Sequence, residues 1–240
     1  FRSDSGNIEL ESEPAGGELR LRIRTDHQSA FYQWFHFRVT GARGVPCTFR
    51  ITNAGGAAYP EAWPGTRPCV STDRERWTRV DARYEGGELR WEHTPTADAT
   101  WYAYFAPYSL ERHQALIARC QQDPRVTLTR LGATLDGRDL DLLRVGTGPR
   151  VVWMIARQHP GESMAEWWME GLLGRLLDPR DALARKLLSQ ATFRIVPNMN
   201  PDGAVRGHLR TNAAGANLNR EWHAPTLERS PEVKLVRDEM

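Results

Sequence analysis

The segment His159-Pro-Gly-Glu162 places an imidazole and a carboxylate three positions apart. An apolar run at residues 151–156 precedes it and predicts a buried strand, and residues 164–177 predict an amphipathic helix. A histidine nitrogen and a carboxylate oxygen are both zinc ligands, and sites in α/β proteins often lie where a strand ends. The pair therefore indicates half of a zinc site. The alternative is a solvated loop histidine beside a glutamate that the helix dipole favours.

Ser163 and Glu166 follow directly and have the spacing of a helix capping box. In such a box the first side chain accepts a hydrogen bond from the start of the helix, and the second reaches back to the cap residue. We predict this arrangement here, and it would fix the turn that carries His159 and Glu162.

A second polar cluster, residues 197–203, follows a predicted strand at 192–196, and a long polar segment continues to residue 222. A loop of this length without apolar periodicity is usually functional or disordered. A guanidinium group binds a carboxylate through two parallel hydrogen bonds, and an asparagine amide adds directed donors. The alternative is that the arginines only solvate a surface loop. The residues concerned are Arg206, Arg210, Asn217, Asn219 and Arg220.

Residues 18–107 show the period-two alternation of half-buried strands, interrupted by turns rich in glycine and proline. Short alternating strands at this spacing predict an antiparallel β-sandwich, with no catalytic constellation of its own. Its large aromatic side chains are expected in the core. The expected strands lie at 19–24, 31–39, 48–52, 77–82, 88–93 and 100–105, and the aromatic residues are Trp34, Trp91, Trp101 and Tyr104.

Strands and helices alternate in the second half of the chain, which predicts an α/β domain with a mixed sheet. Ser109 is expected to cap a helix that ends at Cys120 and closes the first domain. The predicted domains are therefore a sandwich with a closing helix at 1–122 and an α/β domain at 123–240. The expected elements are strands at 126–131, 140–145, 151–156 and 192–196 and helices at 164–177 and 179–190.

The composition gives no reason to expect nucleic acid or a membrane as a partner. Lysine and arginine number 32 against 30 aspartates and glutamates, and no apolar run approaches the roughly 20 residues of a membrane span. The three widely spaced cysteines fit neither a disulfide framework nor a Cys-x-x-Cys metal site. They are expected to be buried thiols in a reducing compartment.

Three motifs together make the sequence recognisable: His159-Pro-Gly-Glu-Ser163, Asn200-Pro-Asp-Gly203 and Asn219-Arg220. Their order and spacing resemble those of zinc metallocarboxypeptidases of the carboxypeptidase A-like family. More narrowly, the chain resembles the cytosolic carboxypeptidase subfamily, in which a β-sandwich precedes the peptidase domain. Residues 33–39 and 102–108 are also similar to that subfamily's N-terminal domain.

The resemblance implies a Zn²⁺ ion with His159 and Glu162 as two of its three protein ligands. It implies that Arg210 polarises the scissile carbonyl and stabilises the oxyanion, and that Asn219 and Arg220 bind the substrate's C-terminal carboxylate. The implied partner is the C-terminus of a peptide or protein, with glutamate as a candidate terminal residue, and the implied location is the cytoplasm.

The family's third ligand, a histidine, and its general-base glutamate both come later than the Asn-Arg pair, and His223 lies too early to match. The 240 residues are therefore either part of a longer enzyme or an inactive remnant. We expect the former, with the α/β domain truncated at its C-terminal end and the fragment inactive by itself. Two alternatives remain open. One is a non-catalytic module that binds a protein or a peptide C-terminus, and the other is a zinc amidohydrolase of acylated amino acids.

Overall fold

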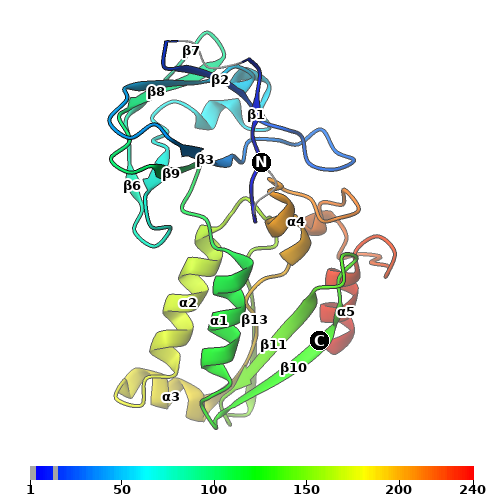
Figure 1. The fold of residues 1–240 in the computed structure, drawn as a ribbon. Coiled ribbons are helices and arrows are strands. Elements are labelled where there is room, and N and C mark those ends of the chain that lie inside the picture. Colours follow the sequence, from blue (N-terminus) through cyan, green and yellow to red (C-terminus); the bar gives the residue numbers. More distant parts are fainter. Residues whose placement is uncertain (1–3, 13–15) are drawn as a thin grey trace. The chain divides into compact units, whose positions relative to one another are not determined.

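The structure is a computed structural model that describes residues 4–12 and 16–240 (Figure 1). The chain forms two compact units: Phe1–Pro107 with Val205–Arg210, and Tyr108–Ala204 with Thr211–Met240. This division differs from the predicted boundary between residues 122 and 123. Helix α1 (Leu110–Cys120) belongs to the second unit because its buried side chains pack into that unit's core.

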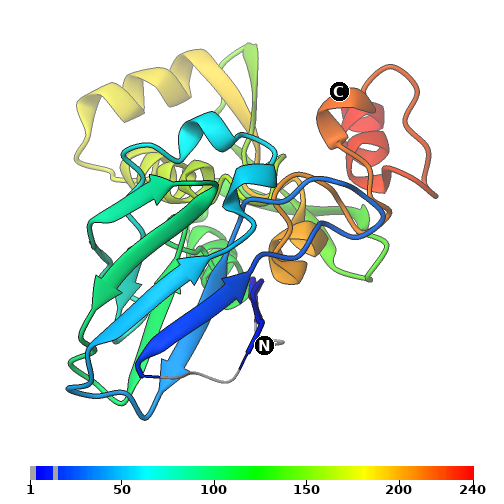
Figure 2. The ribbon, with the colours of Figure 1, turned by 90° about the horizontal axis from the view of Figure 1, so that it is seen from above.

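The first unit contains two β-sheets, as predicted for a sandwich. Figure 2 shows strands of the five-stranded sheet side by side in blue, cyan and green. This sheet has the order β1 (Glu9–Leu10), β2 (Glu18–Arg22), β4 (Cys47–Ile51), β8 (Glu88–His93) and β7 (Ala82–Glu85). The four-stranded sheet has the order β3 (His36–Thr40), β9 (Ala99–Ala103), β5 (Cys69–Ser71) and β6 (Thr78–Arg79).

Aromatic side chains from both sheets form the core between them. The ring centroids of Phe49 on β4 and Tyr102 on β9 lie 4.5 Å apart, and Phe37 on β3 lies 6.4 Å from Trp91 on β8. Such offset and tilted contacts are the favoured geometries of aromatic pairs. Of the four aromatic residues expected in the core, Trp34, Trp91 and Tyr104 are buried, and Trp101 is only partly buried.

The strand expected at 31–39 begins only at His36, and β5 was not expected. The arrangement of the strands also differs from the prediction in two respects. Strands β2 and β4 are parallel to each other, whereas the other strand pairs of the unit are antiparallel. The chain between β2 and β4 forms β3, which belongs to the other sheet. The strand expected at 77–82 is instead two short strands, β6 and β7, that belong to different sheets. Alternation of apolar side chains does not reveal where a chain passes from one sheet to the next.

The second unit is built on a mixed four-stranded sheet of order β10 (Val126–Ala133), β11 (Asp139–Val145), β13 (Ala191–Val196) and β12 (Arg150–Ile155). Figure 1 shows α1, α2 (Met164–Leu176) and α3 (Ala182–Gln190) on one face and α5 (Pro231–Glu239) on the other. Neighbouring residues of a strand serve opposite faces: Leu143 packs in the core with α1 and α2, and Leu142 packs in the core with α5. None of the helices in the described part of the chain is long and apolar enough to cross a membrane.

Strand β12 is not the fully buried strand that its apolar run predicts. Val151 is 58% exposed and Ile155 is 36% exposed. Among the residues that the structure describes, β12 pairs only with β13, so it lies at an edge of the sheet. An apolar run indicates a strand, but it does not show how many neighbours that strand has.

Candidate active site

His159 and Glu162 lie together in the loop between β12 and α2. The Nδ1 atom of His159 is 3.1 Å from the Oε1 atom of Glu162. The His159 side chain is 11% exposed and that of Glu162 is 50% exposed, so the pair faces solvent from the carboxylate side. The buried Nε2 atom of His159 has no hydrogen-bond partner among the described residues.

The two side chains fit one zinc ion. Zinc binds histidine nitrogen and carboxylate oxygen at roughly 2.0–2.2 Å, and two ligands of a tetrahedral ion are then separated by roughly 3.4 Å. The observed spacing is close to that value. Within residues 4–12 and 16–240, no group of three or more His, Cys, Asp and Glu side chains forms a complete metal site. The spacing of the pair thus suits two ligands of one such ion.

Arg157 holds the loop that carries this pair, a role that the sequence did not indicate. It is buried, and its φ of 49° is a left-handed conformation that side-chain-bearing residues rarely adopt. Its Nε–H donates to the carbonyl of Pro160 at 3.0 Å. Its Nη1 donates to the carbonyl of Tyr108 at 2.7 Å and to Glu166 at 2.8 Å. The loop backbone is thereby tied to a buried guanidinium group.

Glu166 does not form the predicted capping box. Ser163 has helical backbone angles and makes no side-chain cap bond, and Glu166 turns inward, where it is fully buried. Its carboxylate accepts from Arg157 and from Asn198 Nδ2 at 3.1 Å, and it lies 2.7 Å from His113 Nδ1. A buried carboxylate needs such partners because it loses its hydration, and this requirement outweighs a cap.

His113 completes this buried charge cluster. Burial lowers the pKa of its ring, but the carboxylates of Asp141 and Glu166 outweigh burial and raise that pKa to about 9. His113 is therefore a cation at neutral pH and lies on the inner side of α1. Two cations, His113 and Arg157, then balance two carboxylates beneath the loop.

The Asn200-Pro-Asp-Gly203 motif follows the end of β13. Its side chains form hydrogen bonds with the loop after β12, at Gln158, and with Thr134. Asn200 Nδ2 donates to the carbonyl of Gln158 at 3.3 Å, and its Oδ1 accepts from the Gly203 N–H at 3.0 Å. A Cβ at Gly203 would lie 2.4 Å from Pro160 Cγ, so only glycine allows the two motifs to approach this closely. Asp202 accepts from Thr134 Oγ1 at 2.7 Å. Residues from Pro201 onward, expected as a loop, form the short helix α4 (Pro201–Arg206).

Asn219 and Arg220 lie on the 3-10 turn η3 (Leu218–Arg220) and are both exposed. The backbone beneath them is fixed, because the carbonyl of Asn217 accepts from the Arg220 N–H at 2.8 Å. Trp222 Nε1 donates to Gln158 Oε1 at 2.6 Å and so links this segment to the loop that carries His159. The arrangement leaves an amide and a guanidinium group available to a ligand.

Arg210 belongs to the first unit, within Val205–Arg210, whereas His159, Glu162, Asn219 and Arg220 belong to the second. Its guanidinium carbon lies 5.6 Å from the ring centroid of Tyr59. His208, which lies in the same segment, accepts a hydrogen bond at Nε2 from the His27 N–H at 3.2 Å.

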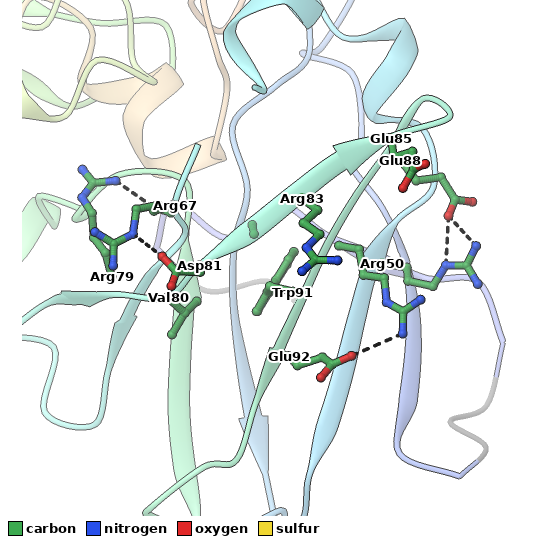
Figure 3. Close-up of a pocket in the computed structure, with 12 residues that line it drawn as sticks. Arg50, Arg67, Arg79, Val80, Asp81, Arg83, Glu85, Glu88, Trp91 and Glu92 are labelled. Atoms are coloured by element: carbon green, nitrogen blue, oxygen red, sulfur yellow. Dashed lines mark hydrogen bonds and ion pairs between the residues drawn. The ribbon is translucent and has the colours of Figure 1, made fainter. Parts of the chain in front are cut away.

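A groove of about 900 Å³ over β4, β7 and β8 is shown in Figure 3. Arg50 pairs with Glu88 at 2.5 Å and with Glu18 at 3.1 Å, and Arg67 pairs with Asp81 at 2.8 Å. Since five arginines and four acidic residues line the groove, its charge is largely balanced internally and does not indicate a polyanion site. The charged lining residues are Arg50, Arg67, Arg79, Arg83, Arg90, Asp81, Glu85, Glu88 and Glu92.

Comparisons with known proteins agree with this architecture. Residues 2–105 match the cytosolic carboxypeptidase N-terminal domain, and residues 113–234, about half of the chain, match zinc carboxypeptidase. A Zymomonas mobilis protein is 53% identical over 237 residues, which cover 99% of this chain and 62% of that protein. Cytosolic carboxypeptidase 1 of Homo sapiens is 27% identical over 278 residues, which cover 96% of this chain and 23% of that protein.

Solved structures show the same fold. A metallo-carboxypeptidase from Burkholderia cenocepacia has a TM-score of 0.96 and 51% identity, with 99% of this chain and 64% of that chain covered. A metallo-carboxypeptidase from Pseudomonas aeruginosa, in complex with (2-guanidinoethylmercapto)succinic acid, has a TM-score of 0.94 and 46% identity. The match covers 99% of this chain and 64% of that chain. These TM-scores confirm the predicted fold class. The chain spans less than two thirds of the length of these relatives. The chain belongs to the zinc carboxypeptidase family and carries the N-terminal domain of the cytosolic carboxypeptidases ahead of its peptidase domain.

Proposed function

We propose that the protein is a zinc-dependent carboxypeptidase that removes residues from the free C-terminus of a peptide or protein. The observation that carries this proposal is the 3.1 Å approach of His159 Nδ1 to Glu162 Oε1 in a member of the zinc carboxypeptidase family. These two residues would hold the ion. When bound, zinc acts as a Lewis acid and lowers the pKa of a coordinated water.

The other predicted residues take complementary roles in this proposal. Arg210 supplies a fixed positive charge to the oxyanion. Asn219 and Arg220 bind the terminal carboxylate, which restricts the reaction to chain ends, since an internal peptide carries no carboxylate there. Because the relatives are longer than this chain, we propose that the remaining zinc ligand and the general base come from outside these 240 residues.

Two finer points of the proposal are the substrate and the location. The resemblance to the cytosolic subfamily supports an acidic terminal residue such as glutamate. The names of the relatives support a cytoplasmic location, and so do the three cysteines, which are free and buried.

The full-length protein and its Glu162→Ala variant provide the test. We expect about one zinc per wild-type chain, measured by atomic emission, together with release of C-terminal amino acids from peptides. Glu162→Ala should lose the metal and the activity, because one remaining ligand binds zinc weakly. Glu228→Ala, a change at an exposed glutamate of the same unit, should keep both.

Stoichiometric zinc in Glu162→Ala would remove that residue from the ligand set. A zinc-loaded wild-type protein that binds peptide C-termini without hydrolysing them would favour the non-catalytic binding module. Hydrolysis of acylated amino acids in place of peptides would favour the amidohydrolase.

A further inference from the structure

Val205–Arg210 is a six-residue part of the peptidase sequence that packs with the β-sandwich. It lies inside the region that matches zinc carboxypeptidase, yet it belongs to the compact unit formed by Phe1–Pro107. The sandwich therefore contains the residue that we propose as the oxyanion-stabilising cation, Arg210.

Backbone and side-chain contacts hold the first half of this segment. The Ser5 N–H donates to the carbonyl of Val205 at 2.9 Å, and Asn7 Nδ2 donates to the carbonyl of Gly207 at 2.9 Å. Gly207 has a φ of +72°, and a Cβ there would lie 2.8 Å from the carbonyl oxygens of Ser5 and Gly6. The segment thus lies directly against the N-terminal backbone, at a distance that only glycine permits.

A buried carboxylate holds the second half. Asp26 is 1% exposed, and its two oxygens accept from consecutive backbone N–H groups, those of Leu209 at 2.7 Å and Arg210 at 2.8 Å. The Asp26 N–H itself donates to the carbonyl of Phe31 at 2.8 Å, and the Leu209 side chain joins the sandwich core. The backbone of Arg210 is therefore held by the Asp26 carboxylate, and the Asp26 backbone is itself held by its hydrogen bond to Phe31.

The Arg210 side chain rests on a second anchored group, Tyr59. Its guanidinium carbon is 5.6 Å from the Tyr59 ring centroid, within the range of a cation–π contact. The buried side chain of Gln33 accepts from the Tyr59 N–H at 2.9 Å and donates to the Tyr59 carbonyl at 3.1 Å. Both the backbone and the guanidinium group of Arg210 are thus supported by the sandwich.

We infer that Asp26 and Tyr59 are positioning residues that hold the backbone and the guanidinium group of Arg210 in one orientation within the first unit. This inference rests on the proposed function, in which Arg210 stabilises the oxyanion. Such stabilisation depends on a charge that is already oriented when the oxyanion forms, and a displacement of about 1 Å can cost roughly 100-fold in rate. A loop arginine without these contacts would have to be ordered in every turnover.

The first experiment replaces Asp26 by Asn in the full-length protein. This change preserves the side-chain shape but turns one acceptor oxygen into an N–H₂ group that faces a backbone N–H. We expect kcat to fall roughly 10- to 100-fold, with KM and zinc content unchanged. Hydrogen exchange at the Leu209 and Arg210 amides should accelerate, which is a readout independent of turnover. Asp98→Asn, at an exposed position of the same sandwich, is the matched control and should leave all of these unchanged.

Tyr59→Ala is the second variant, because Tyr59 is 37% exposed and its removal leaves no buried polar group unpaired. It should lower kcat by roughly 3- to 10-fold, as expected for loss of one cation–π support. It also keeps the inference testable if Asp26→Asn fails to fold.

A double-mutant cycle with Arg210→Ala separates positioning from general stability. If Asp26 and Tyr59 act through Arg210, neither substitution should lower kcat further in the Arg210→Ala background. Losses that multiply with that of Arg210→Ala, or wild-type kcat in both single variants, would overturn the inference. Wild-type kcat in Arg210→Ala itself would overturn the oxyanion role in the proposed function, a result distinct from an additive cycle.

Discussion

Arg220 and Asn219, which we propose bind the terminal carboxylate of the substrate, combine exposed side chains with a fixed backbone. The turn is held by the Asn217 carbonyl and by the Trp222–Gln158 hydrogen bond. Because the backbone is already ordered, binding a ligand here costs little backbone conformational entropy, so less of the interaction free energy is offset.

Arg220→Ala should chiefly weaken binding of substrates with a free C-terminal carboxylate. We expect KM to rise by roughly 10- to 100-fold, since a hydrogen bond to a charged group contributes about 1.5–3 kcal/mol. Steady-state kinetics on matched free and C-terminally amidated peptides measure this. Arg229→Ala, which removes an exposed arginine paired with Glu221, is the control. Equal losses on the amidated peptides would contradict the assigned role.

Glu232 is a buried carboxyl group whose protonation depends on its surroundings in the second unit. Its pKa is raised to about 7, chiefly by burial and in smaller part by the nearby carboxylates of Asp202 and Asp136, whereas hydrogen bonds from its own backbone N–H and from Asn212 act in the opposite direction. Asn212 Nδ2 donates to Glu232 Oε2 at 3.1 Å and to the carbonyl of Arg229 at 2.8 Å. The carboxyl group thus joins the start of α5 to the loop that leads to Asn219 and Arg220.

A pKa above the unfolded value means that the folded state binds the Glu232 proton more tightly. This stabilisation is complete below about pH 4.5 and is lost as pH rises through about 7. Between pH 5 and 8 the free energy of unfolding should therefore fall by roughly 2–3 kcal/mol more in the wild type than in Glu232→Gln. Urea unfolding at several pH values measures it. Glu228→Gln should follow the wild type, and an identical pH profile in Glu232→Gln would refute the assignment.

At the scale of elements, helix α2 carries two glutamates with very different surroundings. Glu166 is fully buried against Arg157 and His113, whereas Glu170 lies at a partly exposed position and pairs with Arg112 and Arg119. The first connects α2 to the loop before it and to α1, so it links three elements beneath the proposed metal site.

Glu166→Gln should destabilise the protein by about 3–5 kcal/mol, because it leaves two buried cations without their shared carboxylate. Glu170→Gln on the same helix should cost about 1 kcal/mol or less, since its ion pairs are partly solvated. Thermal or urea unfolding of both variants provides the comparison. Similar losses in the two variants would show that burial of the charge cluster does not govern the stability of this helix.

Sequence patterns predicted the local parts of the site and missed the parts assembled from distant positions. His159 and Glu162 are three residues apart, so their spacing alone indicated that they share a turn. Arg157 and Glu166 acquire their roles from His113 and Tyr108, which lie about 50 positions earlier in the chain. The capping box failed for the same reason, because a local spacing rule competes with tertiary partners that it does not contain.

The type of the strands was predicted better than their number or arrangement, because the short strands β1 and β5 were not expected. Alternation located β4, β8 and β9 to within a residue or two because each has one buried face. It could not show that β12 lies at an edge of its sheet or that 77–82 divides between two sheets. Those properties depend on neighbouring strands, and a single strand's pattern carries no information about them.

At the scale of the whole molecule, neither compact unit is one continuous stretch of chain. The sequence composition does not reveal this. The second unit is interrupted by Val205–Arg210, which the first unit incorporates. The domain that contains no catalytic motif of its own thereby includes the arginine of the proposed mechanism. The sequence pattern predicted one domain boundary. In the structure the chain passes between the two units three times, because a short segment of the second half belongs to the first unit.

The hydrogen bonds that Asp26 accepts from the Leu209 and Arg210 N–H groups span 183 and 184 residues. At a synthesis rate of about 5–20 residues per second, Asp26 is synthesised roughly 10 to 40 seconds before its partners. Throughout that interval the nascent sandwich contains a carboxylate destined for burial whose two N–H donors have not yet been made. Contacts of such long sequence separation form late in folding. The first unit cannot be completed before Val205–Arg210 has been synthesised, so its completion and the anchoring of Arg210 depend on the same late-made segment.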